Sequence, residues 1–143
     1  MTTIWHHPFT LDDLHPKNEC LQNHLGIEFL EIGPDFLRAR MPVDGRTHQP
    51  FGILHGGASV ALAETVGSMA AAFVVDRSKK RCVGQEINAN HIRAVSNGFV
   101  IGTAKPVHLG RRSHVWEIRI TDEQDRLVCI SRLTMFVLDR TDT

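Results

Sequence analysis

Residues 56–75 read GGASVALAETVGSMAAAFVV. From Ala58 to Val75 this stretch is the most apolar part of the chain, and its length approaches that of a membrane span. Its residues are mostly small, however, and it contains Glu64, a charge that is costly to place in hydrocarbon. We therefore predict a long helix that is buried in a protein core.

Segments with a strand pattern lie on both sides of this predicted helix. Before it, residues 26–32 and 36–41 flank a turn that contains glycine and proline, which predicts a hairpin. After it, four segments follow at residues 81–93, 99–109, 113–121 and 127–138. The turns between them, at residues 96–98, 109–111 and 123–125, are short enough to join antiparallel neighbours.

These elements form an α+β pattern in which a single antiparallel sheet wraps around one helix. In residues 113–121, Trp116, Ile118 and Ile120 alternate with polar residues, which predicts one apolar face. Two short helical segments are expected near the amino terminus, at residues 11–14 with Thr10 as cap and at residues 18–24 with Asn18 as cap. No repeat or linker divides residues 1–143, so we expect a single domain.

Composition narrows the classes of function. Sixteen basic and sixteen acidic residues cancel, so neither nucleic acid nor a membrane is expected as a partner. The three cysteines form no CxxC pair, and the amino terminus lacks a signal-peptide pattern, so we expect a cytoplasmic protein. The nine histidines include no HExxH or other known ligand spacing, so no metal site is expected. No GxSxG elbow is present, which leaves carboxylate chemistry.

The segment QPFGILHGG, residues 49–57, leads directly into the predicted helix. The first amides of a helix lack partners within it and carry partial positive charge, so they suit an oxyanion or a polarised carbonyl. Glycines there let a ligand approach the backbone, and His55 would add a donor. The alternative is that Gly56 and Gly57 only allow tight packing at the helix start.

Glu64 is the only charged residue from Ala58 to Val75, which requires a partner or a role. Ser68 lies four residues further on the same helix face, among small residues that leave room for substrate or a second subunit. The alternative is an ion pair with an arginine across an interface. Gly56 and Glu64 are eight residues apart, or about 12 Å along a helix. If both act on one carbonyl, Glu64 must face the helix start of a second chain, which predicts a dimer.

Basic and histidine side chains gather near two other segments. His91 and Arg93 are expected on one face of the strand that contains Ile87 and Ala89. Further members surround the turn after residues 99–109, namely Lys105, His108, Arg111, Arg112 and His114. Such a cluster beside a glycine-containing turn would suit the phosphates of coenzyme A. The alternative is an ordinary solvated turn.

Four stretches together resemble a known family. They are MPVDGRTHQPFGILHGGASVALAETVGSMA at residues 41–70, GQEINANHIR at 84–93, KPVHLGRRSHVWEI at 105–118 and SRLT at 131–134. The chain resembles the hotdog-fold thioesterases of the 4-hydroxybenzoyl-CoA thioesterase type II group, and most closely the 1,4-dihydroxy-2-naphthoyl-CoA hydrolases of menaquinone biosynthesis. The likeness implies a hotdog fold, hydrolysis of an acyl-CoA thioester, no cofactor apart from the coenzyme A of the substrate, and dimers that pair into homotetramers.

The resemblance also implies roles for individual residues. Glu64 would be the nucleophile or general base, Gln49 would orient water or substrate, and Ser68 would support the site. The Gly56 amide, helped by His55, would polarise the thioester carbonyl. Contacts with substrate and coenzyme A would come from Gly84, His91, Ile92, Arg93, Ala94, His108, Leu109, Gly110, Arg111, Arg112 and Ser113.

The same residues also fit other functions. Near relatives of the resembled enzymes act on fatty acyl-CoA or on aryl-carrier-protein adducts as proofreading thioesterases. A hotdog hydratase or dehydratase, or a non-catalytic acyl-CoA binding module, would be a different class. Helix-start donors combined with Glu64 and Gln49 favour hydrolysis over these.

Overall fold

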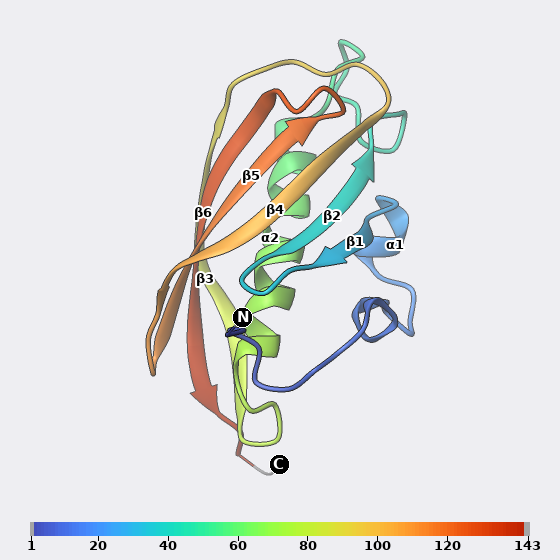
Figure 1. Ribbon diagram of the computed structural model, residues 1–143. Coiled ribbons are helices and arrows are strands. Elements are labelled where there is room, and N and C mark those ends of the chain that lie inside the picture. Colours follow the sequence, from blue (N-terminus) through green and yellow to red (C-terminus); the bar gives the residue numbers. More distant parts are fainter. Residues whose placement is uncertain (1, 142–143) are drawn as a thin grey trace.

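The computed structural model describes residues 2–141 as six strands, one long helix and two short helical segments (Figure 1). The short segments come first, a 3-10 helix η1 (Leu11–Leu14) and helix α1 (Leu21–His24). The remaining elements, in chain order, are β1 (Glu28–Ile32), β2 (Leu37–Pro42), α2 (Gly56–Val74), β3 (Lys80–His91), β4 (Phe99–Leu109), β5 (Ser113–Asp122) and β6 (Leu127–Asp139). The predicted α+β pattern of one antiparallel sheet around a long helix is confirmed.

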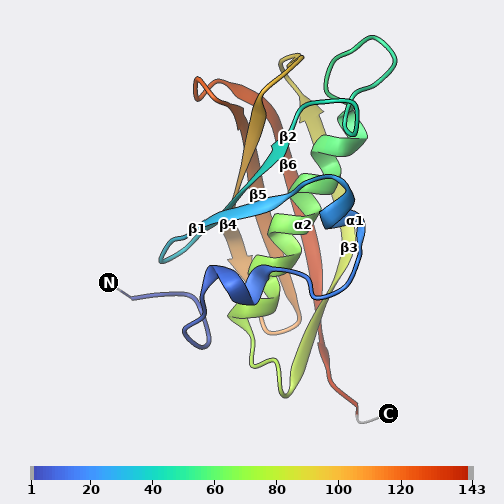
Figure 2. The same cartoon turned by 90° about the vertical axis from the view of Figure 1, so that its right-hand side faces the viewer.

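All six strands form one sheet in the order β1-β2-β4-β5-β6-β3, with every neighbouring pair antiparallel. Figures 1 and 2 show this sheet curving around α2, with β3 at one edge and β1 at the other. The predicted hairpin of β1 and β2 is present.

The expectation that the turn at residues 96–98 joins neighbouring strands is wrong. Strand β3 pairs with β6 at the far edge, so residues 92–98 cross the end of the sheet to reach β4 (Figure 1). Hydrogen bonds hold this crossing segment: the N–H groups of Ile92 and Arg93 donate to the carbonyl of Val128, and the N–H of Leu54 donates to the carbonyl of Val95. The segment thereby ties the start of β6 to the chain before α2.

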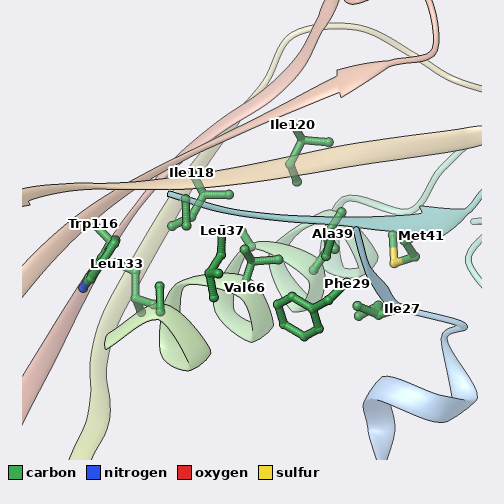
Figure 3. Packing of buried hydrophobic residues seen from close by; sticks show 14 of the residues in the cluster. Ile27, Phe29, Leu37, Ala39, Met41, Val66, Trp116, Ile118, Ile120 and Leu133 are labelled. Carbon is green, nitrogen blue, oxygen red and sulfur yellow. The ribbon is translucent and has the colours of Figure 1, made fainter. Parts of the chain in front are cut away.

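The core lies between the inner face of the sheet and α2 (Figure 3). Trp116, Ile118 and Ile120 are fully buried, as their alternation predicted. A Cβ atom on Gly67 would lie 2.7 Å from Leu133 and 3.2 Å from Ile118. Gly67 therefore lets the helix approach the sheet. The expectation that the small residues around Glu64 leave room for substrate or a second subunit is wrong for Gly67, because Gly67 faces the core.

Helix α2 is long and apolar enough to span a membrane by length and composition. One side of α2 is buried, however, and packs inside the sheet, with the residues Ser59, Leu62, Ala63, Val66, Gly67, Ala70, Ala71 and Phe73. The prediction of a buried helix holds for this side of α2.

Two local predictions at the amino terminus have different outcomes. The helix capped by Thr10 is present, and the Asp13 carboxylate accepts a hydrogen bond of 2.7 Å from the Thr10 N–H. The predicted start of the second helix, with Asn18 as cap, is wrong: the helix begins at Leu21 with Cys20 as cap. The reason is that the side chain of Asn23 accepts from the Cys20 N–H at 3.1 Å and so fixes the first turn there.

Candidate active site

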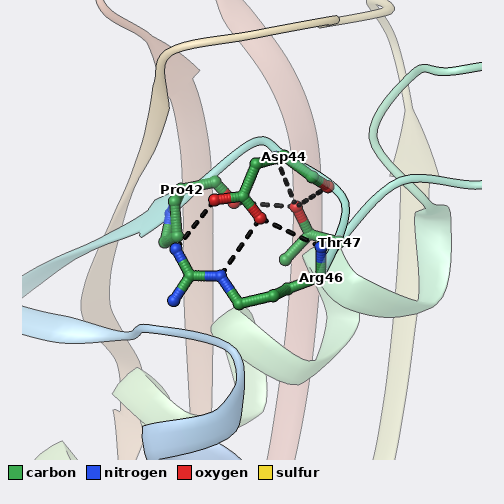
Figure 4. Close-up of polar contacts among 4 residues, drawn as sticks. All are labelled: Pro42, Asp44, Arg46 and Thr47. Atoms are coloured by element: carbon green, nitrogen blue, oxygen red, sulfur yellow. Dashed lines mark hydrogen bonds and ion pairs between the residues drawn. The ribbon is translucent and has the colours of Figure 1, made fainter.

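A tight turn between β2 and α2 anchors the start of the long helix (Figure 4). The Thr47 hydroxyl donates to the carbonyl of Pro42 at 2.7 Å, and the Arg46 guanidinium bonds Asp44 at 2.7 Å. These side-chain and backbone bonds from Arg46 lower the pKa of Asp44 to about 2, so its carboxylate stays ionised near neutral pH. The Thr47 carbonyl then accepts from the His55 N–H at 2.8 Å, which fixes the helix cap.

The first turn of α2 leaves one amide available. The N–H groups of Ala58 and Ser59 both donate to the carbonyl of His55, and the Gly57 N–H donates to His55 Nδ1 at 2.7 Å. Among residues 2–141, the Gly56 N–H donates no hydrogen bond. This is the amide expected to polarise a thioester carbonyl.

The hydrogen bond from Gly57 also assigns the tautomer of His55. Because Nδ1 accepts, a neutral ring carries its proton on Nε2. His55 therefore caps the helix with one nitrogen and presents a donor with the other. The proton on Nε2 agrees with the expectation that His55 adds a donor beside the helix start.

Gln49 lies in the loop before α2 and is partly buried. Its backbone closes a turn, because its N–H donates to the Ile53 carbonyl at 2.8 Å and its carbonyl accepts from the Gly52 N–H at 3.0 Å. The side-chain Oε1 accepts from the Phe51 N–H, so the amide orientation is set by the loop itself. The Nε2 group of Gln49 remains as the donor of this side chain.

Glu64 projects from α2 toward edge strand β3. A Cβ atom on Gly84 would lie only 2.6 Å from its Oε1 atom, so the carboxylate rests on the Gly84 backbone. Within the part of the chain that the structure describes, Glu64 makes no hydrogen bond or ion pair, although it is partly buried. The Ser68 hydroxyl, one turn on, donates to the sulfur of Met135 at 3.7 Å and makes no other hydrogen bond among the described residues. A carboxylate and a hydroxyl thus stand side by side on one helix face with unused hydrogen-bonding capacity.

His91 packs at the other end of the same interface. A Cβ atom on Gly56 would lie 2.8 Å from His91 Nε2, so the imidazole covers the helix start. Further along, Cys82 Sγ donates to the Ala71 carbonyl at 3.5 Å. Strand β3 therefore runs antiparallel to α2, with His91 near Gly56 and Gly84 near Glu64. In one chain, Gly56 and Glu64 remain about 12 Å apart along the helix.

The expected coenzyme A contacts fall into two groups at opposite ends of the sheet. Ser113 pairs with Phe136, which pairs with Val83, whereas His91 pairs with Cys129. Eight residues of β3 separate these levels, or about 25 Å. The segment at residues 91–94 and the turn at residues 108–113 therefore do not meet within one chain.

The turn at residues 108–113 borders a hollow of 440 Å³ lined by Lys80, Arg111, Arg112, Phe136, Val137, Leu138 and Asp139. The bond from Lys80 is the main cause of a lowered pKa of Asp139, with a contribution from Arg111 and Arg112. Three cations against one carboxylate leave this hollow suited to an anion. Within the turn, the Gly110 N–H donates to the Ser113 carbonyl at 2.8 Å, and the Gly110 Cα lies close to the His108 ring.

Three members of the expected basic cluster lie elsewhere. Arg93 follows the end of β3 in the crossing segment, so it does not share a strand face with Ile87 and Ala89. Lys105 pairs with Asp35 at 3.8 Å. His114 points into the core with 2% of its surface exposed, because the inward positions of β5 include it together with Trp116. Its pKa is lowered, mainly by burial and also by His108.

Comparisons with known proteins find similar sequences and structures over most of the chain. The family model of the thioesterase superfamily matches residues 51–129. The chain is 54% identical over 136 residues to the proofreading thioesterase EntH of Cronobacter turicensis, covering 94% of this chain and 98% of that protein. It is also similar to the structure of a mutant of thioesterase PA1618 from Pseudomonas aeruginosa, with 47% identity, a TM-score of 0.94 and coverage of 96% of this chain and 100% of that one. The structure of thioesterase HI1161 from Haemophilus influenzae gives 47% identity, a TM-score of 0.93 and coverage of 98% of each chain.

Proposed function

Because this chain belongs to the thioesterase superfamily and is a thioesterase, we propose that it is a proofreading enzyme with broad specificity for aryl and fatty acyl groups. The observation that carries the proposal is the 54% identity to a proofreading thioesterase, which spans 98% of that protein. The comparisons favour this alternative over hydrolysis of 1,4-dihydroxy-2-naphthoyl-CoA and a place in menaquinone biosynthesis, which they do not support.

Glu64 would activate the attack on the thioester. As a general base it would take a proton from water, whose oxygen bonds to the carbonyl carbon; as a nucleophile it would form an anhydride that water then hydrolyses. In both courses the C–S bond breaks, the sulfur leaves as thiolate and takes up a proton, and the acyl group leaves as a carboxylic acid. The reaction needs no cofactor, since coenzyme A or a carrier thiol is a product.

The negative charge on the carbonyl oxygen needs a donor at fixed distance. The free Gly56 N–H at the start of α2 meets this need, and the Nε2–H of His55 stands one residue away. The Nε2 donor of Gln49 would hold the water or the substrate, and the Ser68 hydroxyl would bond the water beside Glu64.

We further propose that two copies build each site. Edge strand β3 is twelve residues long and pairs with β6 on one side alone, which leaves a template for a second strand. A twofold axis there would pair β3 with its copy antiparallel and place the His91 end of one subunit beside the Lys80 end of the other. The same operation would bring Glu64 of one copy toward the helix start of the other. It would also bring residues 91–94 toward the basic hollow of the partner, where Arg111 and Arg112 would bind coenzyme A phosphates.

Two such dimers would associate as a tetramer in the cytoplasm, as in the resembled group.

A hotdog hydratase or a non-catalytic binding module would share the fold but would release no thiol. The experiment that separates these functions is turnover of a panel of aryl and fatty acyl thioesters, on coenzyme A and on a carrier protein, with detection of free thiol. Thiol release from several acyl groups supports the proposal. Binding without thiol release contradicts it.

A further inference from the structure

We propose that Gly84 and the one-residue bulge that follows it in β3 position the Glu64 carboxylate for catalysis. This inference rests on the proposed role of Glu64. In the resembled family Gly84 is expected to contact the substrate, whereas here the inner surface of this glycine is occupied by a side chain of the chain itself. Gly84 would thus be a positioning residue that acts through Glu64.

The contact between the two residues is close and specific. The Oε1 atom of Glu64 would lie 2.6 Å from a Cβ on Gly84 and the carboxyl carbon 3.7 Å from it. Real Cβ atoms do not approach oxygen to 2.6 Å, so any side chain at position 84 must displace the carboxylate. Glu64 makes no hydrogen bond or ion pair among residues 2–141, and the Gly84 backbone limits how closely its carboxylate approaches β3.

Glycine is not required here by backbone conformation. The glycines with a left-handed φ are Gly26, Gly52 and Gly98, and Gly84 is not among them. Other residues adopt the φ of position 84 without strain, and an alanine in a strand is ordinarily no worse than a glycine. The need for glycine at this position is therefore room for the carboxylate.

The bulge explains how the inner face of β3 meets both the start of α2 and Glu64 near its middle. Gly84 pairs with Met135 and Glu86 pairs with Thr134, so Gln85 has no partner on β6. Seven residues separate Gly84 from His91, and in a regular strand an odd separation puts two residues on opposite faces. The extra residue shifts the alternation, so that Gly84 meets Glu64 and His91 meets Gly56 on the same inner face.

Without the bulge, Glu86, Asn88 and Asn90 would continue the inward series of Cys82 and Gly84. Ile87 and Ala89 are instead the partly buried residues, and the three polar ones are exposed. Bulges commonly re-aim side chains beside active sites. Here the bulge gives the helix a glycine opposite its carboxylate and an imidazole opposite its first amide.

The test is Gly84→Ala, with kcat and KM measured on a coenzyme A thioester. A displacement of about 1 Å at the reacting group costs up to about 100-fold, so we expect kcat to fall by about 10- to 100-fold while KM changes less than about twofold. The matched control is Val83→Ala on the opposite face of the same strand, which should keep kcat within about twofold. A rise in KM with kcat unchanged would assign Gly84 to substrate binding and overturn the proposal, and so would unchanged kinetics.

The effect of Gly84→Ala in a Glu64→Gln background distinguishes a positioning role of Gly84 from a general structural effect of the substitution. In a Glu64→Gln background, Gly84→Ala should lower the residual rate less than about twofold, because the group it misplaces is already inactive. Equal factors in the two backgrounds would contradict the proposal. If Glu64→Gln itself keeps the wild-type rate, the proposed role of Glu64 fails first, so the two failures are distinguishable.

A second variant covers the case in which Gly84→Ala does not fold. Glu64→Asp shortens the side chain by one methylene and withdraws the carboxylate from the added methyl group. The double variant Gly84→Ala/Glu64→Asp should then regain the thermal stability of Glu64→Asp alone. A double variant that remains unfolded would show that the methyl group collides with something other than Glu64, which would overturn the inference.

Discussion

The Nδ1 atom of His55 accepts a hydrogen bond of 2.7 Å from the N–H of Gly57. One side chain therefore caps the central helix and, through Nε2, presents a donor beside the free amide of Gly56. Stability and catalysis share this residue, and the two roles use different nitrogens. They are separable by substitution.

His55→Asn should keep the cap and lose the donor at the position of the imidazole Nε2, which the shorter asparagine side chain does not reach. Asparagine is among the best cap residues, whereas loss of a capping side chain costs about 1 kcal/mol. We expect His55→Asn to melt near the wild type and His55→Ala to melt lower, while both lose about 10-fold or more in kcat. Thermal melts and steady-state kinetics on one thioester check this. A His55→Asn enzyme with wild-type kcat would remove His55 Nε2 from the reaction.

Shared active sites should be visible in mixed oligomers. A dimer of one Glu64→Gln subunit and one His55→Ala subunit would contain one intact site, with Glu64 and the helix start from different copies. Denaturing and refolding an equal mixture should therefore recover about a quarter of the wild-type activity, since about half of the dimers are mixed. Each variant refolded alone is the control. A mixture that is no more active than its components would place each site within one chain.

The basic hollow should govern affinity for coenzyme A. Replacing Arg111 or Arg112 by Ala is expected to raise KM by about fivefold or more, with kcat changed less than about twofold, because the phosphates lie far from the thioester. Higher salt should raise the wild-type KM in the same direction by screening. Arg119→Ala, at a cation paired with Glu117 at 3.6 Å, serves as control. Unchanged KM in both variants would leave the turn without a role in binding.

Buried His114 should make the fold sensitive to acid. Burial lowers its pKa below the ordinary value of 6.5, so the folded state disfavours the proton that the unfolded state takes up. Stability from this group is present above about pH 6.5 and falls as the pH drops further, by up to about 1.4 kcal/mol per pH unit. His114→Leu should therefore lose less thermal stability between pH 7 and pH 5 than the wild type. His24→Gln is an exposed control, and an equal loss in His114→Leu and wild type would contradict this account.

The architecture was largely predictable, because each element has a local pattern. Apolar alternation in residues 113–121 predicts β5, and the run of small residues around Glu64 predicts α2. Glu64 itself stands out as the single charge in that run. The position of β3 in the sheet is not predictable from the sequence in this way. A short connection such as residues 92–98 fits a hairpin to β4 and a crossing to it equally well, and only the pairing of β3 with β6 distinguishes the two.

The details of the site required three-dimensional neighbours. The glycine at position 84 inside a strand pattern is the sequence sign of a bulge, yet it does not show that Gln85 is the unpaired residue. His114 was placed with the surface cations because of its position in the chain, whereas its parity on β5 turns it into the core. The predicted strand at residues 113–121, with Trp116, Ile118 and Ile120 on its apolar face, already contains this parity, so the same alternation predicts a buried His114.

The catalytic assignment of Glu64 is tested most directly by Glu64→Gln, with kcat and the melting temperature measured on the same preparation. An amide and a carboxylate have nearly the same shape, and the structure gives Glu64 no partner among residues 2–141 whose loss would destabilise the fold. The account predicts a melting temperature and oligomer like those of the wild type and a kcat lower by at least about 100-fold. A variant that melts earlier but turns over near the wild-type rate would contradict it, and would instead support an ion pair of Glu64 across the interface.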